Sequence, residues 1–365
     1  MRSRPTAASP GRVLLCGYYG EHNLGDDALL QVLLAQLPDG WTPVVTAHDQ
    51  TLVQQRFAVE TVDRRSLRRV LAALGRCDAL VLGGGSLLQD ATSLNSLLYY
   101  ALLILLARIQ GHPVLLWGQG LGPLRRRISR VLTRLVLPLA TGITWRDQAS
   151  AAQAASWGLA ASSGSDPVWA LDPLPWRGEG GPIVLCWRPV QRLAPAGWLP
   201  YLQALAQLAD RLDRPVLWLP FHQHQDSDLL DQLASAGLIP ATLKARSRVI
   251  EAADPSEAMA WFSSASLVIA MRLHGLILAA LAGSPCAALS YDPKVAAAAA
   301  ALSCPWHDLE LSAPPDLADQ WLALADRATD PASRERLSGE TAVHRLLLQR
   351  LDALRPGQRP GSHPG

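Results

Sequence analysis

The chain has 365 residues, a hydrophobic fraction of 49% and a formal net charge of +2, which indicate a globular protein large enough for two domains. Its arginines are scattered and form no basic stripe, so the composition argues against a nucleic-acid partner. The five cysteines are widely spaced, form no C-x-x-C motif and lie mostly in apolar runs. This usage is typical of buried thiols in a reducing compartment, so we expect a cytoplasmic protein.

The two ends of the chain are predicted to be disordered. Residues 1–10 contain prolines and small polar residues but no apolar segment of the kind that signals secretion. Residues 355–365, RPGQRPGSHPG, are predicted to be a disordered tail. Residues 336–354 are predicted to form a C-terminal helix, whose part 340–354 could pack on either domain.

Short apolar runs of strand length recur along the chain. Each ends in glycine or a polar cluster and is followed by a helical pattern, which is the signature of β-α units and a parallel sheet. The runs are 12–16, 43–47, 79–82, 113–117, 142–145, 182–187, 215–219, 267–270 and 286–290. Residues 162–182 are rich in Pro and Gly and show no helical or strand period.

This pattern predicts an α/β protein with two Rossmann-like domains that face one another across a cleft, as in the GT-B glycosyltransferases. The N-terminal domain spans 11–170, a linker spans 171–181 and the C-terminal domain spans 182–335. Ligands are expected at the carboxyl ends of both sheets. The leucine-rich run 97–109 is shorter than the roughly 20 residues needed to cross a bilayer, so it predicts a buried helix and leaves peripheral membrane contact open.

Three strand-like runs of the first half end in glycine-rich loops. They are CGYYGEHNLGDDALL at 16–30, VLGGGSLLQD at 81–90 and WGQGLGPL at 117–124, and none is a G-x-G-x-x-G fingerprint. Asp26 is expected to cap a helix that begins near Ala28. Six residues of these loops could contact a polyhydroxylated ligand, although capping or bonding within the loop is the alternative reading: Asn23, Asp26, Asp27, Gly84, Asp90 and Gln119.

The sequence Arg-Leu-His-Gly at 272–275 joins a strand-like run to a helix-like run. Arg272 and His274 are thereby placed beside the free N–H groups of a helix start, where proteins bind anions. Arg146, Arg188 and Lys294 also follow strand-like runs and are further candidates for binding an anion. The alternatives are a structural histidine at 274 and an ion pair of Arg146 with its neighbour Asp147.

His222 and His224 occur in the segment PFHQHQDSD, with Asp226 nearby. Histidines two residues apart without a clear third ligand give weak support for a metal. We therefore interpret the segment as a polar loop at a strand end and predict no metal site.

An ordered set of motifs runs through residues 14–295. Its members are GYYGEHNLGDDALL, VLGGGSLLQD, GQGLGPL, TWRD, SDPVW, MRLHG and GSPCAALSYDPKV. In this order they resemble the polysaccharide pyruvyltransferase family, in particular its CsaB-type members. The resemblance implies a GT-B-like scaffold and transfer of the enolpyruvyl group of phosphoenolpyruvate to two hydroxyls of one sugar. A pyruvate ketal forms and phosphate is released, with no cofactor besides phosphoenolpyruvate as co-substrate.

The resemblance also implies roles for single residues. Arg272 and Arg146 would hold the carboxylate and phosphate of the donor, with His274 as the acid that protonates it. Arg188 and Lys294 would complete the donor side, and the glycine loops of the first domain would hold the acceptor. In related systems that acceptor is a sugar of a cell-surface polymer, often lipid-linked, so the enzyme would work close to the inner membrane face.

Two other functions fit the same scaffold. A GT-B glycosyltransferase that uses a nucleotide sugar would share the fold, but an acidic residue for the ribose is not evident in the second half. A non-catalytic sugar- or anion-binding protein is the other alternative, against which stands the presence of Arg146, Arg272 and His274 together.

Overall fold

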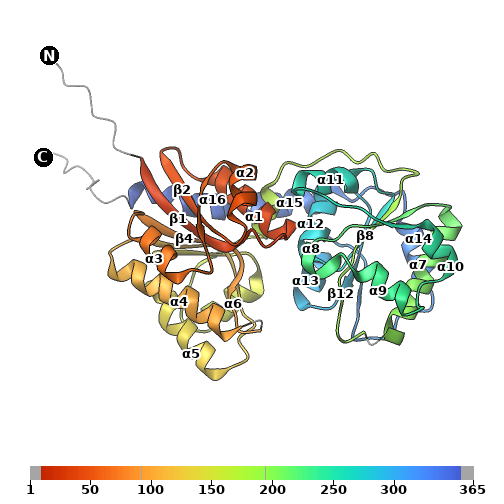
Figure 1. Ribbon diagram of the computed structural model, residues 1–365, viewed down its shortest axis with the longest axis horizontal. Helices are drawn as coiled ribbons and strands as arrows, with labels where there is room; N and C mark the ends of the chain where they lie inside the picture. Colours follow the sequence, from red (N-terminus) through yellow and green to blue (C-terminus); the bar gives the residue numbers. More distant parts are fainter. Residues whose placement is uncertain (1–9, 92, 194, 355–365) are drawn as a thin grey trace, which may run out of the picture. The chain divides into compact units, whose positions relative to one another are not determined.

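The computed structural model describes residues 10–91, 93–193 and 195–354 (Figure 1). The terminal segments that we predict to be disordered lie outside this part, apart from Pro10. The described chain divides into two compact units. The first unit contains residues 10–21, 29–167 and 339–354, and the second contains residues 22–28 and 168–338.

The first unit is built on a parallel sheet of seven strands in the order β3-β2-β1-β4-β5-β6-β7. Its central strands are continuous apolar runs, which suit a sheet covered on both faces. The strands are β1 (Gly11–Tyr19), β2 (Trp41–Ala47), β3 (Glu60–Asp63), β4 (Ala79–Leu88), β5 (Val114–Leu121), β6 (Gly142–Trp145) and β7 (Ser162–Ser163). The helices are α1 (Leu24–Gln36), α2 (Gln50–Phe57), α3 (Leu67–Leu74), α4 (Leu94–Ile109), α5 (Arg127–Val136), α6 (Gln148–Ala155) and α16 (Ala342–Ala353).

The C-terminal helix α16 belongs to the first unit and packs against β5 and β6. A Cβ on Gly142 would lie 2.6 Å from Leu347 and 3.4 Å from Leu115. Leu116, the next residue of β5, packs instead into the core that α3 and α4 cover. Because successive side chains of a strand point to opposite faces, α16 and α4 cover opposite faces of the sheet.

The second unit is built on a parallel sheet of six strands in the order β10-β9-β8-β11-β12-β13. The strands are β8 (Ile183–Cys186), β9 (Val216–Trp218), β10 (Ser247–Val249), β11 (Leu267–Ala270), β12 (Cys286–Ser290) and β13 (Trp306–Asp308). The helices are α7 (Leu199–Leu212), α8 (Gln223–Asp226), α9 (Leu229–Ser235), α10 (Ala241–Arg246), α11 (Pro255–Ser263), α12 (Leu273–Leu281), α13 (Pro293–Ala301), α14 (Leu317–Leu324) and α15 (Pro331–Glu340).

All nine apolar runs that predict strands form strands. The other strands of the described chain, β3, β7, β10 and β13, are the outermost strands of the two sheets. An edge strand has a neighbour on only one side and is partly exposed, so it lacks the continuous apolar run that identifies a central strand. This explains why β7 lies in the segment 162–182, where the sequence shows no strand period.

The segment predicted as a linker is packed on the second unit. Leu174 N–H donates to Leu281 O at 3.0 Å, and the indole N–H of Trp176 donates to Ala265 O at 2.8 Å.

The start of α1 differs from the prediction. The helix begins at Leu24, four residues earlier than expected, and Asn23 rather than Asp26 caps it. The Asn23 side-chain oxygen accepts from Gly25 N–H at 3.0 Å, and its amide group donates to Asp26 Oδ2 at 2.6 Å. The prediction was wrong because an Asn and two Asp residues in one turn are interchangeable as caps at the level of sequence.

The five cysteine side chains are all buried and unpaired with one another. Burial raises the pKa of Cys16 and of Cys304 to about 12. Within the described residues, no helix has both the length and the apolar character to cross a membrane.

Candidate active site

Three of the basic residues singled out from the sequence lie at the carboxyl edge of the second sheet. The chain runs outward from β8 in one direction and from β11 in the other, so the strand order reverses between these two strands. Ligands of open α/β sheets bind at such a reversal. Arg188 follows β8, Arg272 follows β11, and Lys294 follows β12.

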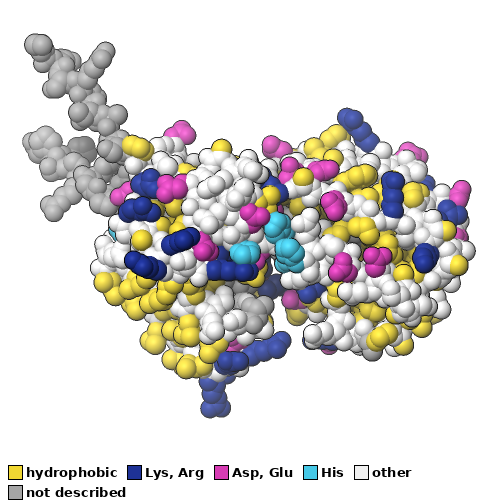
Figure 2. Space-filling model, in the orientation of Figure 1, with side chains coloured by type: hydrophobic (Ala, Val, Ile, Leu, Met, Phe, Trp, Pro, Cys, Tyr) yellow, Lys and Arg dark blue, Asp and Glu magenta, His cyan; other side chains and the backbone are white. Residues whose placement is uncertain are grey.

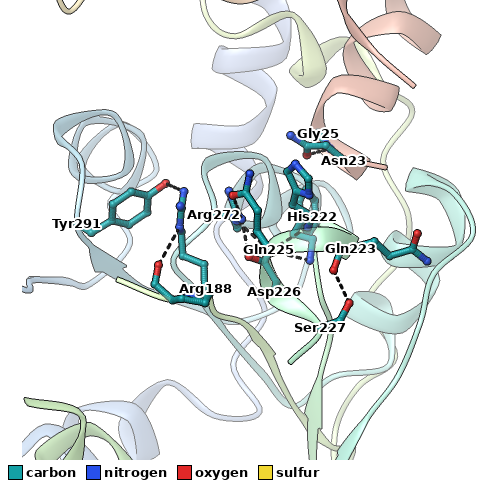
Figure 3. Close-up of polar contacts among 12 residues, drawn as sticks. Asn23, Gly25, Arg188, His222, Gln223, Gln225, Asp226, Ser227, Arg272 and Tyr291 are labelled. Atoms are coloured by element: carbon teal, nitrogen blue, oxygen red, sulfur yellow. Dashed lines mark hydrogen bonds and ion pairs between the residues drawn. The ribbon is translucent and has the colours of Figure 1, made fainter. Parts of the chain in front are cut away.

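Arg272 is held by a buried carboxylate at the end of α8, the short helix that follows β9 (Figure 3). Its Nε and Nη2 donate to Asp226 Oδ2 and Oδ1 at 3.0 and 2.5 Å, and Nη2 also donates to Gln225 Oε1 at 3.1 Å. The Asp226 side chain is 0% exposed and that of Arg272 is 13% exposed. Among the described residues, no hydrogen bond reaches Nη1 of Arg272. The guanidinium group is therefore oriented by one edge, and Nη1 is available to a ligand.

Asp226 itself is fixed by the backbone. Its Oδ2 accepts from the N–H groups of Phe221 and His222 at 3.2 and 2.8 Å. A carboxylate that is buried but accepts this many hydrogen bonds is a stable anchor for an arginine. The sequence pointed to Asp226 only as a metal ligand that lacked partners, and its pairing with Arg272 was missed.

Arg188 lies against Tyr291, which follows β12. Its Nη1 donates to the Tyr291 hydroxyl at 3.0 Å, and its guanidinium carbon lies 4.8 Å from the centre of the Tyr291 ring (Figure 3). Such stacking fixes a planar guanidinium group without neutralising it. Lys294 lies in the first turn of α13, where its backbone N–H donates to the capping Asp292 at 3.0 Å.

His274 is the second residue of α12, directly after Arg272 and Leu273. The first turn of α1 packs against it, because a Cβ on Gly25 would lie only 2.1 Å from His274 Nδ1. Gly25 is therefore required by a close approach. Gly275, which follows His274 in the MRLHG motif, lets α12 start close to β8, since a Cβ there would meet Cys186 at 3.0 Å.

The loop of Asn23 and Asp26 belongs to the second unit, whereas the sequence assigned it to the N-terminal domain. Leu24 N–H donates to Phe221 O, and Gln223 N–H donates to His22 O, both at 3.0 Å. Asn23 and His222 also form an isolated antiparallel bridge. Two segments far apart in the sequence therefore form one local structure beside His274. Local patterns cannot show such a pairing.

Arg146 lies in the first unit and is buried. Its Nη1 donates to Asp166 Oδ2 at 3.0 Å and its Nη2 to Ser86 Oγ at 3.2 Å. Asp147 is only a distant neighbour, with its Oδ2 3.9 Å from Arg146 Nε, and it caps α6 instead. The ion-pair partner of Arg146 is therefore Asp166, which the sequence did not single out although it lies within the SDPVW motif.

Gln119 and Gly84, predicted on the acceptor side, have structural tasks. Gln119 is fully buried, and its amide group donates to the carbonyl oxygens of Leu82 and Trp117 at 3.1 and 3.3 Å. It thereby ties β4 to β5 and does not offer its N–H groups to a ligand. Gly84 has a φ of +34°, and a Cβ there would lie 2.6 Å from Leu29. Because Gly84 has no side chain, the buried side chain of Leu29 can pack against its backbone.

The histidines near β9 do not form a metal site in the described part of the chain. His224 lies between His22 and His222, with ring-centre distances of 4.9 and 6.2 Å. Across residues 10–91, 93–193 and 195–354, no group of three or more His, Cys, Asp or Glu side chains could hold a metal ion.

Solved structures with the same fold have little sequence in common with this chain. HepE from Anabaena, solved with UDP-glucose, aligns with a TM-score of 0.60 at 15% identity, covering 94% of this chain and 99% of its own. The UDP-GlcNAc 2-epimerase of Methanocaldococcus jannaschii aligns with a TM-score of 0.61 at 12% identity, covering 94% and 99%. MurG of Acinetobacter baumannii aligns with a TM-score of 0.51 at 13% identity, covering 95% and 99%. These likenesses establish the GT-B type of fold.

Sequence comparison identifies the family. No curated protein sequence matches the chain. The profile for polysaccharide pyruvyl transferase matches residues 23–293, a range that contains Asn23, Arg146, Asp226, Arg272 and His274. The chain belongs to the polysaccharide pyruvyl transferase family.

Proposed function

We propose that this protein transfers the enolpyruvyl group of phosphoenolpyruvate to two hydroxyls of one sugar in a cell-surface polysaccharide or its lipid-linked precursor. The product is a pyruvate ketal, and phosphate is released. Membership of the family supports pyruvyl transfer. The observation that carries the donor assignment is Arg272, which the buried Asp226 orients at the start of α12 beside His274.

The donor is a small dianionic or trianionic molecule, and the site is rich in matching groups. Guanidinium groups bind carboxylates and phosphates through paired hydrogen bonds. Arg272 keeps Nη1 for the donor, and the partial positive charge at the start of α12 favours an anion at the same place. Arg188 and Lys294 add positive charge along the same sheet edge. Arg146, in the first unit, is proposed as a further donor ligand.

The chemistry needs one acid and two sugar hydroxyls. His274 donates a proton to C3 of phosphoenolpyruvate, so that C3 becomes a methyl group and C2 becomes an electrophile with oxocarbenium character. The first hydroxyl adds to C2, and its proton returns to the neutral His274. The C2–O bond to phosphate then breaks with its electron pair on the phosphate, the second hydroxyl adds to C2, and its proton leaves with the phosphate.

The acceptor is proposed to lie beside Asn23 and Asp26, which the structure joins to the unit that carries His274. The arginines offset the charge of the donor, so we propose no metal ion or other cofactor. A sugar on a growing, lipid-linked chain would place the enzyme in the cytoplasm at the inner membrane face.

Thermal unfolding with and without phosphoenolpyruvate tests the donor site. A ligand at about 100 times its Kd stabilises the folded state by about 2.7 kcal/mol, which raises the Tm of a unit of this size by about 5–10 °C. We expect this shift for the wild type and for His274→Ala, and no shift for Arg272→Ala. Arg214→Ala is the matched control, because Arg214 also pairs with an aspartate in the second unit, at 2.9 and 2.8 Å.

The outcome also decides between donors. Stabilisation of the wild type by uridine diphosphate but not by phosphoenolpyruvate would contradict the proposal and favour a nucleotide-sugar glycosyltransferase. If Arg214→Ala also loses the rise in Tm with phosphoenolpyruvate, the loss in Arg272→Ala reflects lower protein stability and not a missing donor contact.

A further inference from the structure

The outer surface of α4 and α5 in the first unit is apolar and exposed. Six large aliphatic side chains on it are between 43% and 70% exposed. They are Leu98, Leu105 and Ile109 of α4 and Ile128, Val131 and Leu135 of α5, which we call the α4–α5 face. The two helices pack against each other, and Figure 2 shows apolar side chains gathered over this region.

The exposed apolar side chains of α5 are not needed by its packing. Ile128, Val131 and Leu135 recur at three- and four-residue spacing and so share one side of the helix. The buried side of α5 is made by Ser129, Thr133 and Val136. Two of these three buried residues are small and polar, and the partly buried Leu132 also packs against the core. The helix nevertheless exposes three large aliphatic side chains, more than an ordinary surface helix does.

Positive charge borders these side chains. Arg125, Arg126, Arg127 and Arg130 are exposed, and within the described residues none of them forms an ion pair. The sequence contains no Asp or Glu from residue 91 to residue 146.

The one nearby acid, Asp90, is used internally. It is buried and accepts from the backbone N–H groups of Arg125 and Arg126 at 2.7 and 2.8 Å. Burial opposes its ionisation, but these hydrogen bonds hold the pKa of Asp90 below its ordinary value. Asp90 therefore stays charged as an anchor for the loop that carries the arginines, and it is not available on the surface.

We infer that the α4–α5 face binds the surface of an anionic lipid bilayer. An exposed apolar stripe bordered by arginines matches a bilayer interface, where aliphatic groups enter the acyl boundary and cations meet lipid phosphates. A second copy bound by the same face would bring arginines against arginines, which like-charge repulsion disfavours. The inference rests on this face alone and holds whether or not the protein transfers pyruvyl groups.

Flotation of the full-length protein with vesicles tests the inference. One vesicle is pure phosphatidylcholine, and the other contains phosphatidylglycerol at about one third, a fraction that gives a negative surface potential. The apolar variant carries Ile128→Ser, Val131→Ser and Leu135→Ser, and the charge variant carries Arg126→Gln, Arg127→Gln and Arg130→Gln. The matched control on α16, on the opposite face of the sheet, carries Arg345→Gln, Leu346→Ser and Arg350→Gln.

We expect the wild type and the α16 control to float with the anionic vesicles only. Each arginine near an anionic surface strengthens binding about fivefold, so the charge variant should bind about 100-fold more weakly. The apolar variant should bind the anionic vesicles at least about tenfold more weakly than the wild type, and it should not bind them at all when salt screens the charges. Unchanged thermal unfolding of the variants would exclude misfolding as the cause.

Three results would overturn the inference. The first is no flotation of the wild type with anionic vesicles. The second is an equal loss of vesicle binding in the α16 control, which would indicate that binding depends on the overall charge of the protein and not on the α4–α5 face. The third is a concentration-dependent dimer that the apolar variant abolishes, which would identify a second copy as the occupant.

Discussion

Replacing Asp226 by Asn tests whether a buried carboxylate positions the donor arginine. The asparagine side chain has nearly the same shape, but it carries no charge and offers one acceptor oxygen instead of two. Arg272 would then lose its counter-ion and one of its two hydrogen bonds to this side chain. The N–H groups of Phe221 and His222 would compete for the acceptor that remains.

The size of the effect follows from burial. Removing one partner of a buried ion pair costs about 3–5 kcal/mol, because the other charge is left without compensation. The Asp226 side chain is fully buried, but Arg272 retains 13% exposure, so water relieves part of the cost. We therefore expect the free energy of unfolding to fall by about 3 kcal/mol, which lowers the Tm of a unit of this size by about 6–12 °C.

Urea unfolding and phosphoenolpyruvate titration measure the two consequences separately. Asp226→Asn should weaken donor binding, and a double-mutant cycle with Arg272→Met should give a coupling energy above about 1.5 kcal/mol. The matched control is Asp326→Asn. Asp326 makes the same two-bond pair with Arg214, but its side chain is 28% exposed. A partly exposed pair is expected to contribute about 1 kcal/mol or less, and its loss should leave donor binding unchanged.

Either of two results would refute the reasoning. If Asp226→Asn destabilises the protein no more than Asp326→Asn does, the burial argument fails. If donor affinity survives intact in Asp226→Asn, Arg272 needs no carboxylate to be positioned.

Three further predictions follow from single contacts. Gly25→Ala places a Cβ 2.1 Å from His274 Nδ1, so we expect the rate of phosphate release to fall at least about tenfold. The helix content measured by circular dichroism should not change, because Ala is favoured over Gly in a helix by about 1 kcal/mol. Full activity would contradict the placement of His274. Gly120→Ala places a Cβ 2.4 Å from Ser86 Oγ and 3.0 Å from Arg146 Nε, so we expect a loss of about 1–3 kcal/mol in urea unfolding. Adding Ser86→Ala should recover part of that loss, and no recovery would count against the clash. Burial lowers the pKa of His344, whose Nε2–H donates to Ser165 O at 2.8 Å. Below pH 6.5 the unfolded chain therefore binds a proton at this histidine more readily than the folded protein does. The free energy of unfolding consequently falls on acidification, by at most about 1.4 kcal/mol per pH unit. His344→Gln should flatten this slope in unfolding measured between pH 7 and about pH 5, and an unchanged slope would assign it to other groups.

The sequence by itself determined the two parallel sheets and the family. Central strands of a parallel sheet are buried on both faces, so each must be a continuous apolar run, and all nine such runs form strands. The residues that follow these strands must lie at one edge of the sheet, which is why Arg188, Arg272 and Lys294 could be grouped from their positions alone.

Only the tertiary structure decided which side chains meet. Arg272 and Asp226 are 46 residues apart, and His344 and Thr144 are 200 residues apart, so neither pair leaves a local pattern. The four edge strands were missed because each pairs with a neighbour on one side only and is partly exposed, so it lacks the continuous apolar run of a central strand. Gln119 is a further example. Its position between two glycines resembles that of a ligand-binding residue, but the packing of β4 against β5 buries it completely. Local periodicity records how a segment faces solvent, whereas the partner of a buried polar group depends on where the rest of the chain folds.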